Sequence, residues 1–378
     1  MTTHAHARTA ARRRTLWCAA GLTTLALALT GCGAVDATGA ADVPLVGVAM
    51  PTTTSDRWIA DGKNVESQLE ALGYGVDLRY AENDVPTQVE QLSAMIAAGA
   101  DALVVGSIDG VALKDVLADA AAADIPVIAY DRLIRESPDV DYYATFDNQR
   151  VGVQQATTLL QGMGVLDAGG RPTGAPGPFV VELFAGSADD NNATVFYQGA
   201  MSVLQPYLDA GTLVVPSGQT DFATIETPAW DPKNATARMQ ELLPAYTGTG
   251  LTLDGVLSPY DGISRAVLES LRGIGYGTDA QPFPTVTGQD AEVDSARSIV
   301  AGEQYATVYK DTRQLAEVAV AMVHALLDGA EPETNDVTSY DNGVKVVPSY
   351  LLTPQVVTRE NYEAVLVDGG YYTAQELS

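Results

Sequence analysis

Short apolar segments alternate with helix-like segments along most of the chain, and this alternation limits the fold more than any other feature. The first expected strands are residues 45–49, 76–80, 102–106 and 125–130. The uninterrupted apolar run at 125–129 is typical of a strand that is covered on both faces. Between two of them, Asp84 and Pro86 mark the start of a helix with an apolar stripe. Strict strand–helix alternation predicts an α/β fold with right-handed crossovers and a parallel sheet.

A second alternating series follows a short strand at 142–148, so the sequence predicts two similar halves. Its expected strands are residues 179–185, 213–215 and 254–258, and another strand ends at 286–290. A strand at 307–311 leads into a helix that carries His324, and a last strand is expected at 344–352. Pro348 indicates that this last strand is an edge strand or a crossing segment. With 378 residues, the chain is long enough for two domains.

The strand at 125–130 ends abruptly in an adjacent acid and base, Asp131 and Arg132. Ligands of parallel sheets bind just beyond the carboxyl ends of strands. A carboxylate offers hydrogen-bond acceptors and a guanidinium offers a rigid fork of donors, which together suit a polyhydroxylated ligand. A surface ion pair that caps the strand is the alternative interpretation.

Other polar and aromatic side chains also fall at or near expected strand ends in both halves. With Asp131 and Arg132 they make up the expected ligand site: Arg57, Trp58, Asn148, Asn191, Asn192, Phe196, Trp230, Asp261, Asp290 and Lys310. Each alone has another reading, as a helix cap, a turn residue or an aromatic anchor of a helix. Their joint placement, at the ends of strands from both halves, favours a ligand-binding cleft.

The first 31 residues have the pattern of a secretory signal peptide. Arg8 and Arg12–Arg14 precede the apolar segment 16–29, which is too short to span a membrane. The sequence Leu-Thr-Gly-Cys at 29–32 resembles a bacterial lipobox, which predicts lipidation of Cys32. An ordinary signal peptide with a chance cysteine is the alternative. Residues 32–43 are then a tether between the lipid and the folded protein.

Charge and composition exclude several classes of function. The net charge is −27, and removal of residues 1–31 leaves 17 basic and 48 acidic residues, a net charge of −31. Such acidity argues against nucleic-acid binding. Cys18 and Cys32 are the only cysteines, and His324 is the only histidine after residue 31. We therefore expect no disulfide, zinc site or histidine-based catalytic triad, no other metal and no cofactor.

Several longer motifs resemble one known family. They include Ser-Asp-Arg-Trp-Ile at 55–59, Val-Ile-Ala-Tyr-Asp-Arg-Leu-Ile-Arg at 127–135, Tyr-Tyr-Ala-Thr-Phe-Asp-Asn at 142–148, Asp-Asp-Asn-Asn-Ala at 189–193, Leu-Ser-Pro-Tyr-Asp-Gly at 257–262 and Gly-Gln-Asp-Ala-Glu-Val at 288–293. Through them the chain resembles the type I sugar-binding proteins of ABC importers, in the xylose and multiple-monosaccharide-binding branch. The resemblance covers nearly all of the chain after the leader.

The resemblance implies two αβα lobes with parallel sheets, joined by a three-strand hinge and binding a monosaccharide between them. The expected crossings lie near residues 146–147, 310–311 and 347–348. The first lobe is then 44–146 plus 311–347, and the second 147–310 plus 348–378. Asn234 falls where relatives differ and is left out of the expected site.

The resemblance also implies partners and a location. The ligand is an aldose such as xylose, glucose, galactose or arabinose, and the receiving partner is the permease of an ABC transporter. We expect a monomer outside the cytoplasm, held on the outer face of the membrane only by its lipid. Cys32 is a departure, because the member of the family that this chain resembles most is free in the periplasm.

Three other functions compete with this interpretation of the sequence. A lipid-anchored glycoside hydrolase would use two of the aspartates, but most of these acids have basic neighbours, which lower rather than raise their pKa values. A sensor that presents its closed form to a receptor kinase or chemoreceptor is not distinguished from an importer by sequence. A repressor of the same fold would need a DNA-binding helix pair where the leader stands.

Overall fold

The structure is a computed structural model that describes residues 43–378. The expected signal peptide and Cys32, with nearly all of the expected tether, fall outside the described residues. Within residues 43–378, no helix combines the length and the apolar character needed to span a membrane.

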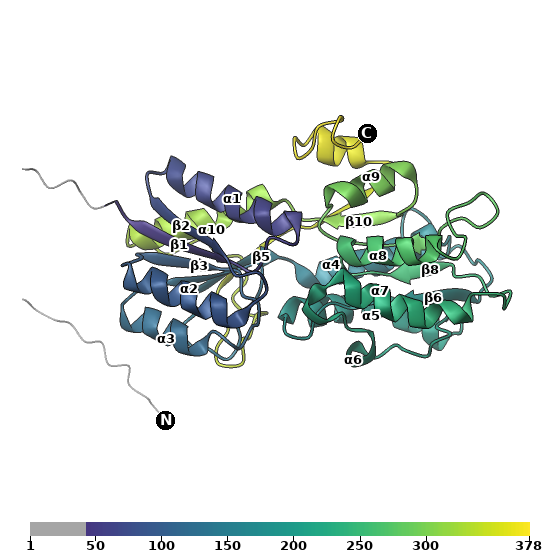
Figure 1. Ribbon diagram of the computed structural model, residues 1–378, viewed down its shortest axis with the longest axis horizontal. Helices are drawn as coiled ribbons and strands as arrows, with labels where there is room; N and C mark the ends of the chain where they lie inside the picture. Colours follow the sequence, from purple (N-terminus) through teal and green to yellow (C-terminus); the bar gives the residue numbers. More distant parts are fainter. Residues whose placement is uncertain (1–42) are drawn as a thin grey trace, which may run out of the picture. The chain divides into compact units, whose positions relative to one another are not determined.

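A six-stranded, all-parallel sheet forms the centre of the first lobe (Figure 1). Its strands, in the order β11-β5-β4-β3-β1-β2, are β11 (Ser349–Leu352), β5 (Tyr142–Phe146), β4 (Val127–Tyr130), β3 (Ala102–Val105), β1 (Leu45–Met50) and β2 (Gly75–Tyr80). The parallel pairing follows from the alternation of strands and helices, because each helix returns the chain to the same edge.

Helices cover both faces of this sheet, and each face has its own apolar core. α1 (Asp56–Ala71) and α10 (Thr312–Leu327) pack on one face, where Val104 and Ile128 are buried. α2 (Val85–Ala97) and α3 (Lys114–Ala122) pack on the other face, where Leu103 and Val105 are buried. The expected start of α2 is confirmed, since the Asp84 side chain accepts a hydrogen bond from Thr87 N.

The second lobe is built on a four-stranded parallel sheet in the order β7-β6-β8-β9. The strands are β7 (Leu213–Val214), β6 (Phe179–Leu183), β8 (Gly255–Leu257) and β9 (Thr285–Val286). An isolated parallel bridge, Gln289 to Val308, extends it toward β10 (Ala306–Tyr309), which pairs with β12 (Gln355–Thr358) in the antiparallel sense.

Helices on both sides of this sheet close two further cores. They are α4 (Asn148–Gly162), α5 (Asn191–Asp209), α6 (Phe222–Ile225), α7 (Pro232–Leu242), α8 (Asp261–Arg272) and α9 (Val293–Ala301), with short 3-10 turns at Pro228–Trp230 and Leu243–Ala245. The C-terminal segment, with a π-helical turn at Glu363–Val367, packs near α9 (Figure 1). Hence β-strands from two distant parts of the chain complete the second lobe.

The chain passes between the two lobes after β5, after β10 and after β11. The third passage corrects the sequence-based expectation, which put it at residues 347–348 with 348–378 in the second lobe. β11 pairs with β5, from Ser349 opposite Tyr143 to Leu352 opposite Phe146, so this strand belongs to the first lobe. The expected strand at 344–352 is shorter, because Pro348 has no N–H for the ladder. The edge position that Pro348 indicated is confirmed.

Candidate ligand-binding site

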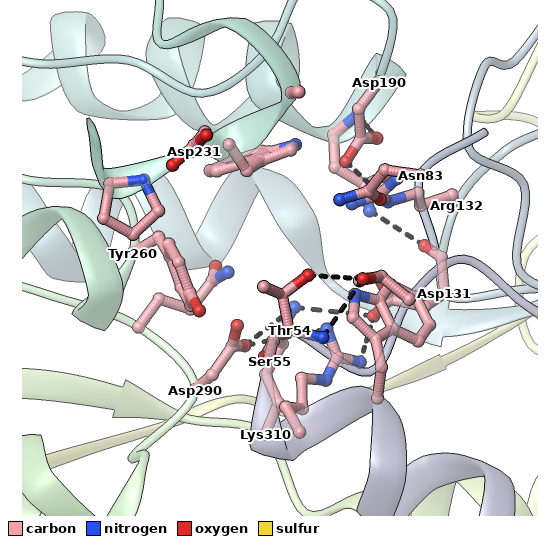
Figure 2. A pocket seen from close by; sticks show the side chains of 18 of the residues that line it. Thr54, Ser55, Asn83, Asp131, Arg132, Asp190, Asp231, Tyr260, Asp290 and Lys310 are labelled. Carbon is pink, nitrogen blue, oxygen red and sulfur yellow. Dashed lines mark hydrogen bonds and ion pairs between the residues drawn. The ribbon is translucent and has the colours of Figure 1, made fainter. Parts of the chain in front are cut away.

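A cavity of about 480 Å³ lies where strand ends of the two lobes face each other. The first lobe contributes the loop and helix start after β1 and the residues that follow β4. The second lobe contributes the start of α5, the turn around Trp230 and the segments that follow β8, β9 and β10. Figure 2 shows these side chains converging on one space. The cavity therefore lies at the carboxyl ends of strands, where parallel sheets bind their ligands.

A buried cluster of alternating charges forms the floor of the cavity. Asp131 accepts a hydrogen bond from Arg57 Nη2, and its Oδ1 lies 3.4 Å from Lys310 Nζ. Lys310 Nζ also lies 3.3 Å from Asp290 Oδ1. All four side chains are at most 7% exposed. Burial alone would raise the pKa of Asp131, but the charges of Arg57 and Lys310 hold it well below its usual range.

A second carboxyl group lies behind Arg57. Asp61 Oδ2 is 3.0 Å from Arg57 Nε, and Asp61 Oδ1 accepts a hydrogen bond from Tyr130. Burial raises the pKa of Asp61 to about 7, although Arg57 opposes the shift. These contacts hold the Arg57 guanidinium in one orientation, with Nη1 left facing Asp290 at 3.7 Å.

Aromatic side chains border the charged cluster on several sides. The Trp58 ring has the guanidinium carbons of Arg57 and Arg132 at 5.0 and 5.2 Å from its centre. In the second lobe, Phe196 and Trp230 meet edge to face with ring centres 6.4 Å apart. Flat apolar faces next to fixed donors and acceptors match the two kinds of surface on a sugar ring.

A network of amides and carboxyls joins the lobes on the side of Arg132. Arg132 Nε lies 3.1 Å from Asp190 Oδ2, and Asp190 caps α5 by accepting from Asn192 N at 2.9 Å. Burial raises the pKa of Asp190, and Arg132 opposes that shift. Asn192 Nδ2 donates to the Asp131 carbonyl at 2.8 Å, while its Oδ1 accepts from Asn148 at 2.9 Å.

Several residues at the cavity hold a left-handed backbone. Asp131 has φ 60°, Asp290 has φ 89°, and consecutive residues Ala229 and Trp230 have φ 55° and 56°. Non-glycine residues adopt this region at a cost, and they concentrate at ligand sites. The conformation turns the Asp131 and Asp290 carboxylates out of the strand direction and into the cavity.

The cavity brings together nine of the twelve expected site residues: Arg57, Trp58, Asp131, Arg132, Asn192, Phe196, Trp230, Asp290 and Lys310. The other three, Asn148, Asn191 and Asp261, do not line it. Asn148 lies behind Asn192 and is fully buried. Asn191 is the first residue of α5.

Asp261 lies behind the cavity wall in a network of its own. Its Oδ1 accepts from Gln304 Nε2 at 2.9 Å, and its Oδ2 accepts from Glu292 N at 2.9 Å and Thr307 Oγ1 at 3.0 Å. Burial raises the pKa of Asp261 to about 8, with Glu292 adding to the shift. In this structure Asp261 therefore supports the loop that holds Asp290.

Other lining residues were not foreseen from the sequence. They are mainly small or polar groups beside the expected ones: Thr54, Ser55, Asn83, Asp190, Asp231, Lys233, Tyr260, Arg265 and Gln289. Asp190 and Tyr260 belong to the motifs at 189–193 and 257–262, so the expected site residues in the same motifs already indicated these two loops. Asn83, with φ 58° in the turn after β2, carried no such signal.

Within residues 43–378, no three His, Cys, Asp or Glu side chains come together in a group that could hold a metal ion. Asp131, Asp190 and Asp290 are paired with arginine or lysine side chains, and Asp231 caps α7 by accepting from Lys233 N. The arrangement suits direct hydrogen bonding to a neutral, hydroxyl-rich molecule.

Comparison with known proteins agrees with this geometry. Residues 46–331 match the family model described as the periplasmic binding protein domain. The chain belongs to the periplasmic binding protein family. This membership confirms the two-lobed α/β fold, and the expectation of a binding protein rather than an enzyme.

The relatives of this periplasmic binding protein include sugar-binding members. It is 56% identical to the multiple sugar-binding periplasmic receptor ChvE of Rhizobium radiobacter over 89% of this chain and 93% of that one. It is 54% identical to the multiple sugar-binding periplasmic protein SbpA of Azospirillum brasilense, over 88% of this chain and 91% of that one. A solved ABC transporter solute-binding protein from Clostridium phytofermentans, with bound β-D-glucose, is 44% identical, with a TM-score of 0.82 over 88% of this chain and all of that one. These matches confirm the resemblance found in the sequence motifs.

Proposed function

We propose that this protein captures a monosaccharide in the cavity between its lobes and delivers it to an ABC importer outside the cytoplasm. The observation that carries the proposal is the buried cluster of Arg57, Asp131, Lys310 and Asp290, bordered by Trp58, Phe196 and Trp230. The sugar-binding names of the relatives and the glucose in the related structure support it.

The charged groups take the sugar hydroxyls in pairs, and the aromatic rings cover its C–H faces. Asp131 accepts from a hydroxyl while Arg57 or Lys310 donates to its neighbour, since the three groups already lie in contact. Asn192 and Arg132 act from the side of the cavity. Asn148, Asn191 and Asp261 act indirectly, by fixing Asn192, the start of α5 and the loop before α9.

Lobe movement provides capture and release. In the open form the sugar contacts one lobe, and closure adds the second set of hydrogen bonds and expels water. The three passages between the lobes, after β5, β10 and β11, act as the hinge. The closed form then docks on the permease as a monomer.

Anchoring through Cys32 is part of the proposal. If Cys32 is lipidated, the mature protein is recovered with membranes, and Cys32→Ser leaves the leader uncut or releases the protein. Recovery of the native protein wholly in the soluble fraction, with a mature N-terminus other than Cys32, contradicts this anchoring without affecting sugar binding.

A thermal-shift screen followed by isothermal titration tests the central proposal. We expect at least one of glucose, galactose, xylose, arabinose and ribose to raise the melting temperature and to bind with one-to-one stoichiometry. At a hundred times the Kd a ligand stabilises the folded state by about 2.7 kcal/mol, which such a screen detects readily. If none of these five sugars binds, the proposal is overturned.

Sensing is a second function of the same site. ChvE is named a receptor, and a closed sugar-bound form could be presented to a receptor kinase or chemoreceptor as well as to a permease. Loss of sugar uptake on deletion, with growth on the sugar impaired, would favour import. Loss of a sugar-induced transcriptional or chemotactic response with normal uptake would favour sensing.

A further inference from the structure

A second cavity, of about 440 Å³, lies on the other side of the sugar-site wall. Arg57 and Asp290 line both cavities, so these two side chains form the partition between them. Asp290 Oδ1 is buried and has ionic contacts but no hydrogen-bond donor with good geometry among the described residues. The second cavity is nearly as large as the first and has no role in the proposed capture of a sugar.

Both lobes and the C-terminal segment contribute to this second cavity. The first lobe supplies Ala60 and Asn64 of α1 and Thr312 at the start of α10. The second lobe supplies the start of α9, and the C-terminal segment supplies Tyr371 and Tyr372. Tyr372 is fixed by donating to the Ala291 carbonyl at 3.0 Å. The walls are therefore ordered elements rather than a loose surface fold.

The charges around the second cavity balance one another. Three helices, α1, α9 and α10, begin at its wall, and their N-terminal ends carry partial positive charge. Asp56 and Glu292 offset these ends. Arg313 lies 2.7 Å from Asp311 and Arg297 lies 2.9 Å from Asp294, so both guanidinium groups already have partners. An anionic ligand would therefore gain no unpaired guanidinium group from Arg297 or Arg313.

Hydrogen-bonding capacity nevertheless remains on both the donor and the acceptor side. Asn64 Nδ2 donates to Thr312 Oγ1 at 3.0 Å, whereas the Asn64 amide oxygen has no partner among the described residues. The Tyr371 hydroxyl has only a long contact, 3.4 Å, to Thr312 Oγ1. Hydroxyl groups, which both donate and accept, satisfy this mixture, and the neighbouring tyrosine rings suit C–H faces.

We propose that this cavity, formed by α1, the starts of α9 and α10 and residues 371–376, is a second binding site for a small neutral polyol or sugar. It is distinct from the first site but shares the Arg57–Asp290 partition with it. An occupant contacts both lobes, so it stabilises the arrangement of the lobes seen here.

Titration with xylitol, a neutral polyol, tests the second site in protein whose first cavity is already saturated with its best monosaccharide. We expect a further, weaker binding event. Ala60→Leu places a larger side chain in the second cavity alone and should weaken this event at least tenfold, while sugar affinity stays within twofold. Ala121→Leu, an exposed alanine-to-leucine change on α3, is the matched control and should alter neither event.

Asp131→Asn separates this test from the proposed function. The variant should bind sugar about ten- to a hundredfold more weakly but retain the xylitol event, and Ala60→Leu should show the reverse. The second site is overturned if xylitol does not bind beside the saturating sugar, or if Ala60→Leu leaves its binding unchanged. If no monosaccharide binds, the proposed function fails on its own. Xylitol titrations of Asp131→Asn and of the double variant Asp131→Asn, Ala60→Leu then still show whether the second cavity binds a polyol.

Discussion

At the scale of single residues, the site depends on a few carboxylates that are buried with their partners. The sequence predicts Asp131 and Asp290 as site residues because each stands at the end of an expected strand. It did not reveal that both adopt a left-handed backbone, or that Arg57 and Lys310 from opposite lobes meet at them. Such contacts arise only from tertiary structure, since the four residues are far apart in the chain.

Asp131→Asn should weaken sugar binding about ten- to a hundredfold, since a charge-assisted hydrogen bond contributes roughly 1.5–3 kcal/mol. The change keeps the shape of the side chain but leaves Arg57 and Lys310 short of one negative charge. Because that cluster is buried, the melting temperature without sugar should fall as well. Isothermal titration and melting curves measure the two effects.

The matched control for this change is Asp115→Asn, an exposed acid in the first turn of α3. It should leave sugar affinity unchanged and lower the melting temperature only slightly, since an exposed acid in the first turn of a helix contributes at most about 1 kcal/mol. If the folded Asp131→Asn protein binds sugar as tightly as the parent, the placement of the site at Asp131 is wrong.

Gly186 makes room for the Trp230 ring. A Cβ atom at this position would overlap the six-membered ring of Trp230. Gly186→Ala should therefore displace the indole and weaken sugar binding about three- to tenfold, the range expected for one aromatic contact. Gly75→Ala, whose Cβ would meet only ordinary contacts, is the control. Equal affinities for the two variants would show that Trp230 does not contact the sugar.

At the scale of elements, much of the architecture follows from local patterns, and the exceptions have identifiable causes. Apolar strands and the Asp84 cap were readable because their signals are local. The start of β11 was misplaced because three valines precede Pro348, yet this segment forms a turn with a bridge from Asp341 to Val346. Likewise, the sequence places Asp261 beside Tyr260 but does not determine that only Tyr260 faces the cavity.

The packing of α4 against α5 depends on glycine at the crossing point. Gly152 and Gly199 face each other there, and a Cβ at Gly152 would overlap the Phe196 carbonyl oxygen. Alanine is the better helix former by about 1 kcal/mol, so an uncrowded site would gain stability from Gly→Ala. Here crowding against backbone should reverse the sign and cost about 1–3 kcal/mol.

Urea denaturation of Gly152→Ala measures that cost, and sugar titration reports on Phe196. Because Phe196 lies on the same turn of α5, its displacement should also lower sugar affinity. A variant that is more stable than the parent would mean that the two helices separate without penalty and that the crossing does not fix Phe196.

At the scale of the whole molecule, buried carboxyl groups make stability depend on pH in two opposite ways. Arg57 and Lys310 hold the pKa of Asp131 below its unfolded value, so this stabilisation is present above about pH 4 and is lost as pH falls. Burial raises the pKa values of Asp61 to about 7 and Asp261 to about 8. Both groups therefore bind protons more tightly in the folded state, and their contribution falls as pH rises.

The pH window for Asp261 lies between its pKa in the unfolded chain and its pKa in the folded protein. Between about pH 4 and pH 8 the unfolded chain has lost this proton and the folded protein keeps it. The free energy of unfolding should then fall by up to about 1.4 kcal/mol per pH unit for this group, and the contribution is gone above about pH 8. Asp261→Asn mimics the neutral acid and removes this titration. The free energy of unfolding of the variant should therefore fall less steeply than that of the parent between about pH 5 and pH 8.

Urea denaturation at a series of pH values compares the parent, Asp261→Asn and the exposed control Asp115→Asn. Asp61 titrates in the same window, so the Asp261→Asn curve should keep part of its slope up to about pH 7 and become flat beyond it. The control should follow the parent throughout. If Asp261→Asn also follows the parent, then Asp261 is ionised in the folded protein at neutral pH. In that case the hydrogen bonds from Gln304, Thr307 and the Glu292 N–H outweigh its burial.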